Sequence, residues 1–105
     1  MRTIEKQMPE TLYRASRYFR VLGNPTAYMI LKKLGRGCKT PSMLSKELNV
    51  SIHTISMTLR NLRQVNLVRY ETNGNTKEYW VKDAGVTNLL KQAEEIADTM
   101  RKKKK

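Results

Sequence analysis

The sequence contains a single cysteine and a single histidine in 105 residues. One cysteine cannot form a disulfide within the chain, and one Cys plus one His cannot fill the four positions of a structural zinc site. No apolar run approaches the ~18 residues of a membrane-spanning helix, and no leader peptide is visible. These absences predict a cytoplasmic chain with no cofactor, no metal site and no membrane partner.

Acidic residues are also scarce, above all in the middle of the chain. Glu47 is the only acid between Thr11 and Tyr70, while eleven Lys and Arg residues fall in the same stretch, a formal charge of +10. A polyanionic partner would relieve the resulting self-repulsion. An anionic membrane surface would do so too, but no segment has the exposed Trp, Phe and Leu face of an interfacial helix. The charge therefore favours a nucleic acid as partner.

The same scarcity argues against catalysis. His53 lies among serines and threonines, with no carboxylate nearby in the sequence. A pair of His53 with Ser51 or Ser56 would lack the third group that orients a catalytic base. We therefore predict no catalytic residues and no enzymatic activity. Cys38 is expected to be a small, partly buried residue, with a redox switch as the alternative.

Helical periodicity and capping residues predict four helices in the first two-thirds of the chain. The first runs from Pro9 to Gly23. The second begins at Asn24 and Pro25, and the third, residues 41–48, begins at Thr40 and Pro41, because a capping side chain followed by Pro is a strong start signal. The expected inward stripe of the first helix is Leu12, Ala15, Phe19 and Leu22.

The fourth helix, residues 51–65, is the stretch around which the chain is organised, and Ser51 is expected to cap its start. Its buried face is predicted to be Ile52, Ile55, Leu59 and Leu62, and its opposite face holds His53, Thr54, Met57, Arg60, Asn61 and Gln64. That face has hydroxyls and an arginine but no acid, as a duplex groove requires. Taken alone, the segment could equally be an ordinary surface helix. With the third helix and the turn at residues 48–50, it forms a helix-turn-helix.

A β-hairpin and a final helix complete the pattern. Residues 67–71 and 77–81 are β-prone runs, and the Asn73-Gly74 pair between them is the strongest short-range hairpin signal. Asp83 can cap the last helix. We divide the chain into a flexible lead-in at residues 1–8, one domain at 9–100, and a basic tail at 101–105.

The last helix has an apolar stripe that follows an already complete domain. The stripe either packs on its own domain or forms a seam with a second subunit, and a chain this small gains from such a partner. For the seam we predict Leu12 and Ala15 of the first helix, with Leu89, Leu90, Ala93, Ile96, Ala97 and Met100 of the last.

Three stretches resemble the ArsR-type winged-helix repressors. They are the entry to the second helix (residues 19–26), the helix-turn-helix (44–62) and the wing (67–80). The resemblance implies a mainly α fold with a β-hairpin wing, an α+β winged helix-turn-helix in the order α-α-α-α-β-β-α. It also implies a homodimer that pairs through its first and last helices, binds a palindromic operator and represses transcription.

The chain departs from that family at the positions of its metal sensors. The Cys-x-Cys pattern at the start of the third helix is missing from residues 40–45, and the last helix has Glu94, Glu95 and Asp98 but no His. Zinc prefers Cys and His ligands, so we expect no metal sensing. The effector is left open.

Together these features predict a sequence-specific regulator that binds double-stranded DNA and is held on the nucleoid by that binding. The predicted DNA contacts are Thr40, Ser51, His53, Thr54, Ser56, Met57, Arg60, Arg63, Asn75 and Lys77. The recognition helix at 51–65 would enter the major groove, and the wing at 72–77 would lie on the backbone or the minor groove. A non-specific architectural or nucleic-acid-coating protein is the alternative, since phosphate contacts give affinity without sequence information. A protein-interaction module is a third.

Overall fold

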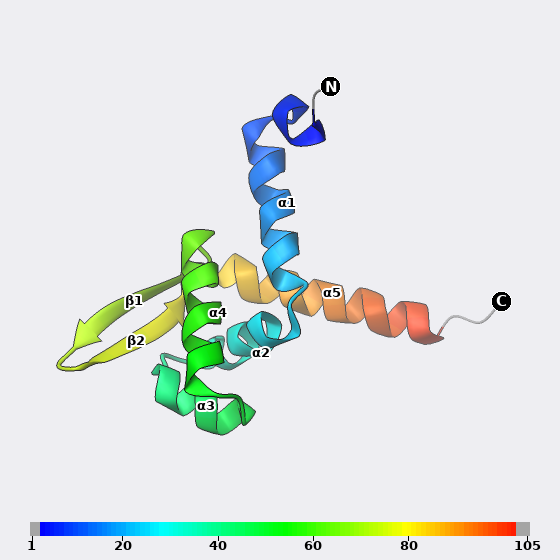
Figure 1. The fold of residues 1–105 in the computed structure, drawn as a ribbon. Coiled ribbons are helices and arrows are strands. Elements are labelled where there is room, and N and C mark those ends of the chain that lie inside the picture. Colours follow the sequence, from blue (N-terminus) through cyan, green and yellow to red (C-terminus); the bar gives the residue numbers. More distant parts are fainter. Residues whose placement is uncertain (1–2, 103–105) are drawn as a thin grey trace.

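The computed structural model describes residues 3–102, and its order of elements confirms the predicted fold (Figure 1). The elements are η1 (Ile4–Gln7), α1 (Glu10–Leu22), α2 (Pro25–Leu34), α3 (Pro41–Leu48), α4 (Ile52–Gln64), β1 (Val68–Asn73), β2 (Thr76–Val81) and α5 (Ala84–Lys102). The 3-10 turn η1 falls in the expected lead-in, and α5 includes the first two residues of the expected tail. Residues 1–2 and 103–105 lie outside the described residues, and the division into lead-in, domain and tail stays a prediction.

The helices begin at the predicted caps. The side chains of Asn24, Thr40 and Ser51 each accept a hydrogen bond from the backbone N–H three residues on, at 3.0–3.2 Å. Asp83 accepts one from the N–H two residues on, at 2.8 Å. Asn49 ends α3 with a φ of 56°, a left-handed conformation that Asn tolerates better than most residues. Local capping therefore fixes the turn between α3 and α4.

The hairpin is tighter than predicted. Strands β1 and β2 are antiparallel from the pair Val68–Val81 to the pair Asn73–Thr76. The loop is therefore only residues 74–75, and Gly74 supplies the positive φ, 67°, that two-residue hairpin turns need. Lys39, before α3, also exchanges two backbone hydrogen bonds with Tyr79, at 3.0 and 2.8 Å. This bridge ties the wing to the helix-turn-helix, and no sequence pattern predicted it.

The core lies between α2, α3, α4, the base of the wing and the first half of α5. Its fully buried side chains are Ile30, Leu31, Leu44, Ile55, Leu59, Leu62, Val68 and Leu90. Tyr79 is also buried, whereas the next residue, Trp80, is half-buried. Residues of α2 and α4 share this one cluster, so the two helices form one close-packed unit.

Five side chains depart from their predicted environments. Leu12 and Phe19, expected on the inward stripe of α1, are 56% and 59% exposed, because Leu22 is the one buried residue of this helix. Ile52 is 50% exposed, because the first residue of α4 overhangs the core. Cys38 is exposed rather than partly buried. Leu90, expected on a seam between subunits, is 1% exposed within its own domain.

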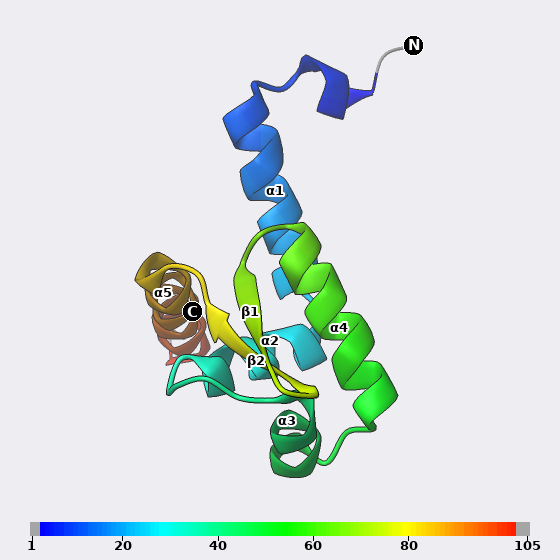
Figure 2. The same ribbon diagram turned by 90° about the vertical axis from the view of Figure 1, so that its left-hand side faces the viewer.

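Helices α1 and α5 project from the rest of the molecule in two different directions (Figures 1 and 2). Leu22 is the one buried residue of α1, and Leu90 is the one buried residue of α5. The radius of gyration is 15.7 Å, whereas a compact domain of this length has about 13 Å. Within residues 3–102, no helix is long and apolar enough to cross a membrane.

Candidate nucleic-acid interface

Helix α4 exposes the side chains that the sequence assigned to DNA contact. His53, Thr54, Ser56 and Arg60 are exposed, and Met57 is 51% exposed. The opposite face packs into the core through Ile55, Thr58, Leu59 and Leu62. The helix has no acidic residue, so its free face combines polar and cationic side chains with the apolar Met57. Such a face offers donors and an apolar contact to the edges of bases without repelling phosphates.

The first turn of α4 constrains Ser51 and Thr54. The Ser51 hydroxyl accepts the backbone N–H of Thr54 at 3.2 Å and donates to the Thr54 hydroxyl oxygen at 3.0 Å. Because Thr54 accepts this bond, its own O–H stays available as a donor. Thr54 is therefore oriented to meet an acceptor, whereas Ser51 acts first as the helix cap.

Two of the cations predicted to contact DNA lie against one tyrosine ring of the wing. The guanidinium carbon of Arg63 lies 4.9 Å from the centre of the Tyr70 ring, and the Lys77 ammonium lies 4.8 Å from it. Both distances are within the range of cation–π attraction. Tyr70 thus places one cation from α4 and one from the wing against the same ring. We name this group the Tyr70 platform.

The pKa of the neighbouring Tyr79 also responds to the positive charge of the arginines on α4. Burial raises the pKa of the Tyr79 hydroxyl, while the nearby guanidinium groups of Arg63 and Arg60 oppose that rise. The Tyr79 ring lies 5.2 Å from the Tyr70 ring, centre to centre. In the part of the chain that the structure describes, none of Arg60, Arg63 and Lys77 forms an ion pair. The surface that carries Arg60, Arg63 and Lys77, on α4 and the wing, is therefore basic.

Other basic residues either lie near Arg63 or are neutralised by Glu47. Arg14 and Arg17 of α1 line a hollow of about 380 Å³ together with Arg63. By contrast, Glu47 forms ion pairs with Lys39 at 3.0 Å and with Lys33 at 3.8 Å. The Lys39 hydrogen bond to Glu47 holds the pKa of this carboxyl below its usual range. The one acid of the central stretch therefore pairs with Lys33 and Lys39 and not with the cations of α4.

The structure brings most of the predicted DNA contacts together. In both views the tip of the hairpin, which includes the exposed Asn75, lies level with the first half of α4 (Figures 1 and 2). Thr40 stands apart, because it is half-buried and caps α3. Sequence reasoning missed the role of Tyr70. The signal was available, since Tyr70 pairs with Tyr79 and Lys77 lies two residues before Tyr79 on the same face of the hairpin.

The predicted seam residues divide into two groups. Leu12, Ile96 and Met100 are 56%, 61% and 65% exposed, and Ala93 and Ala97 are exposed as well. Ala15 is half-buried, and Leu89 is half-buried against the core next to Leu90. An apolar hollow of about 210 Å³ joins α1 to α5, lined by Phe19, Leu22, Gly23, Tyr28, Leu89, Leu90 and Ala93.

We expect the purified protein to bind no stoichiometric zinc. Across residues 3–102, no three His, Cys, Asp or Glu side chains gather closely enough to hold a metal ion. Elemental analysis after dialysis checks this, and one zinc per chain would contradict it.

The exposed thiol of Cys38 is tested separately as a redox switch. If a Cys38→Ser variant keeps the wild-type response of DNA binding to oxidant, Cys38 is not a redox switch.

Comparisons with known proteins agree with this geometry. A helix-turn-helix domain family model matches residues 22–71. An HTH-type transcriptional regulator of Methanocaldococcus jannaschii is 30% identical over 88 residues, which span 83% of this chain and 99% of the relative. The chain thus belongs to the family of helix-turn-helix transcriptional regulators, and it is a DNA-binding protein of the winged type.

Solved structures place the fold more finely. The homodimeric winged helix-turn-helix DNA-binding domain of a possible ArsR-family regulator from Mycobacterium bovis is 22% identical, with a TM-score of 0.77, over 85% of this chain and 82% of that one. NolR from Sinorhizobium fredii is 25% identical, with a TM-score of 0.76, over 91% and 94%. The fold is therefore the ArsR-type winged helix.

Proposed function

We propose that the chain is a sequence-specific repressor that binds a palindromic operator as a homodimer. Residues 51–65 enter the major groove, and the wing at 72–77 lies on the backbone or in the minor groove. The observation that carries this proposal is the exposed, acid-free face of α4, which stands level with the wing tip. In a cell, such binding would hold the protein on the nucleoid.

Each exposed residue has a distinct role in this arrangement. His53, Thr54 and Met57 face base edges, where the free Thr54 O–H meets an acceptor and Met57 makes an apolar contact. Arg60 reaches a guanine or the backbone. The remaining predicted contacts meet phosphate or sugar: Thr40, Ser51, Ser56, Arg63, Asn75 and Lys77.

Lys77 and Tyr70 supply a test of the wing. The change Lys77→Gln should weaken binding on every sequence alike and lower the dependence of log affinity on log salt by about one unit, because one phosphate contact is lost. Tyr70→Phe should keep the platform and bind as the wild type does. Tyr70→Leu should lower the slope as Lys77→Gln does, because the ring that holds the cations is gone.

Binding measured across a salt series provides the readout. Lys91→Gln, which removes one charge from an exposed position on α5, is the control and should keep the wild-type slope. If Lys77→Gln also keeps that slope, the wing does not touch phosphate.

Support for two subunits comes from the exposed apolar side chains of the projecting helices. Leu12 and Phe19 on α1 and Ile96 and Met100 on α5 are each more than half exposed. Burying such groups across a seam yields about 25 cal/mol per Å² of apolar area removed from water. The Mycobacterium bovis relative is a homodimer. Two domains on a two-fold axis place their recognition helices about 34 Å apart, one turn of duplex.

The alternative of a non-specific coating protein is favoured by the net charge of +12. Selection of duplexes from a random pool by the purified protein separates the two functions. We expect an enriched palindrome whose half-sites lie about 10 base pairs apart, centre to centre. Tight binding with no enriched sequence would favour the coating protein.

Repression has its own test. The enriched palindrome is placed across the start site of a promoter, and transcription in a purified system is measured as the protein is added. We expect transcription to fall as the site fills, because the bound dimer occupies the polymerase site. Unchanged or increased transcription would contradict repression.

A further inference from the structure

Helix α5 consists of two halves with different surroundings. Val86, Leu89 and Leu90 in its first half pack against the core. Ile96 and Met100 in its second half are 61% and 65% exposed, and this half extends away from the domain. Glu94 lies between the two halves, where α5 leaves its own domain. Contacts at this point determine the direction of the projecting half.

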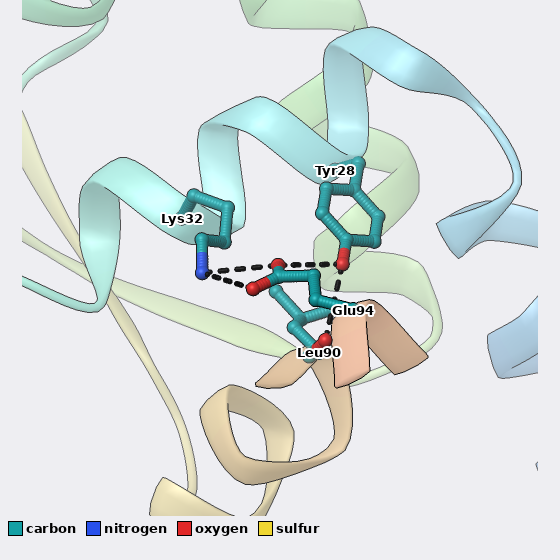
Figure 3. Close-up of polar contacts among 4 residues, drawn as sticks. All are labelled: Tyr28, Lys32, Leu90 and Glu94. Carbon is teal, nitrogen blue, oxygen red and sulfur yellow. Dashed lines mark hydrogen bonds and ion pairs between the residues drawn. The ribbon is translucent and has the colours of Figure 1, made fainter. Parts of the chain in front are cut away.

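Glu94 is held there by two residues of α2 (Figure 3). The Tyr28 hydroxyl donates to Glu94 Oε2 at 2.7 Å, and the same hydroxyl lies 3.2 Å from the carbonyl oxygen of Leu90. The Lys32 ammonium donates to Glu94 Oε1 at 3.0 Å and lies 3.0 Å from Oε2. We name Tyr28, Lys32 and Glu94 the α2–α5 bracket.

At neutral pH the protonation states of Tyr28 and Glu94 favour the hydrogen bond between them. Burial and the bond to Glu94 raise the pKa of Tyr28 to about 12, so its hydroxyl remains a donor at neutral pH. The Tyr28 hydrogen bond, followed by that of Lys32, lowers the pKa of Glu94, so the carboxylate remains ionised. Hydrogen bonds to an ionised acceptor are shorter and stronger than neutral ones.

The bracket adds direction to an attachment that is otherwise apolar. The apolar packing of Val86, Leu89 and Leu90 is non-directional, so it constrains the rotation and tilt of α5 less sharply than hydrogen bonds do. Tyr28 and Lys32 lie one turn apart on α2 and both hydrogen-bond to Glu94 of α5. Two bonds to one side chain restrict both the rotation and the tilt of α5. Because α2 and α4 share one core, the bracket completes a rigid path from the recognition helix to the projecting half of α5.

We propose that the α2–α5 bracket sets the angle at which α5 leaves the domain and thereby selects the spacing between the two half-sites of the operator. The inference rests on the proposed homodimer. If α5 pairs with its partner, its direction fixes the separation of the two recognition helices. One base pair changes that separation by about 3.4 Å, so a small change of angle alters the preferred spacing.

The test uses the palindrome enriched by the wild-type protein, in duplexes whose half-sites are moved closer or further apart by one and two base pairs. Tyr28→Phe keeps the ring and removes the hydroxyl, and Glu94→Gln keeps the shape and removes the charge. Glu95→Gln makes the same chemical change at the next, exposed position and is the matched control. Sedimentation confirms that each variant is a dimer, and thermal melting confirms that it is folded.

The wild type and Glu95→Gln should prefer the selected spacing about tenfold over spacings one base pair away. Tyr28→Phe and Glu94→Gln should bind all these duplexes within about threefold of one another while their dimer affinity is retained. If Glu94→Gln does not fold, the more conservative Tyr28→Phe decides.

Two results overturn the inference, and they differ in what else fails. If folded Tyr28→Phe dimers melt at a lower temperature but keep the wild-type spacing preference, the bracket only stabilises the fold and the proposed function is untouched. If the wild type is a monomer, or enriches no palindrome, the proposed function fails together with the inference.

Discussion

The change Ile96→Glu is expected to give a folded monomer whose affinity for a palindromic duplex is roughly 100-fold or more below that of the wild type, since linkage of two binding sites is lost. Ile96 is 61% exposed in the single chain, so the glutamate is solvated in the monomer and costs the domain little. In a dimer seam the same carboxylate would be buried without a partner, which is strongly unfavourable. Sedimentation at micromolar concentration and a binding titration measure the two effects.

Two controls sharpen this experiment. Lys91→Gln changes the net charge by the same amount from an exposed position on α5 and should stay dimeric. Leu90→Glu should not fold, because Leu90 is 1% exposed in the core of its own domain, where truncation of a large side chain alone costs ~2–5 kcal/mol. An Ile96→Glu protein that stays dimeric and binds at full affinity would show that α5 is not the seam.

Loss of base discrimination is the second large effect. Thr54→Ala and Met57→Ala should each lose about 1–3 kcal/mol of preference for the enriched duplex over a scrambled one. Both side chains are exposed, so neither change opens a cavity in the core. Competition binding against the two duplexes measures the preference directly.

Matched changes away from the proposed interface control for general effects on the protein. Thr11→Ala on α1 and Met29→Ala on α2, where Met29 is 45% exposed, should keep the wild-type preference. Equal losses on the enriched and scrambled duplexes would remove Thr54 and Met57 from base readout and leave them as backbone contacts.

Local signals predicted the elements of this fold well. Asn24, Thr40, Ser51 and Asp83 all cap the helices that they were expected to begin, because capping depends on a few neighbouring atoms. The Asn-Gly pair likewise predicted the hairpin. The periodicity of α4 correctly separated its exposed polar face from the buried Ile55, Leu59 and Leu62.

Contacts between distant segments were the part that the sequence did not predict. The bridge between Lys39 and Tyr79 and the bonds from Tyr28 and Lys32 to Glu94 join residues 40 or more positions apart. The apolar stripe of α5 could not be divided between core and seam, because periodicity identifies a face but not what covers it. Only the structure assigns Leu90 to the core and leaves Ile96 exposed.

The specificity ratio tests the central claim most directly, namely that the acid-free face of α4 reads DNA sequence. The affinity of the purified protein is measured for the enriched duplex and for a scrambled duplex of equal length, at one physiological salt concentration. We expect the enriched duplex to bind at least about 1,000-fold more tightly, as specific regulators do. Equal affinity for the two duplexes would contradict the account and leave a protein that binds phosphates alone.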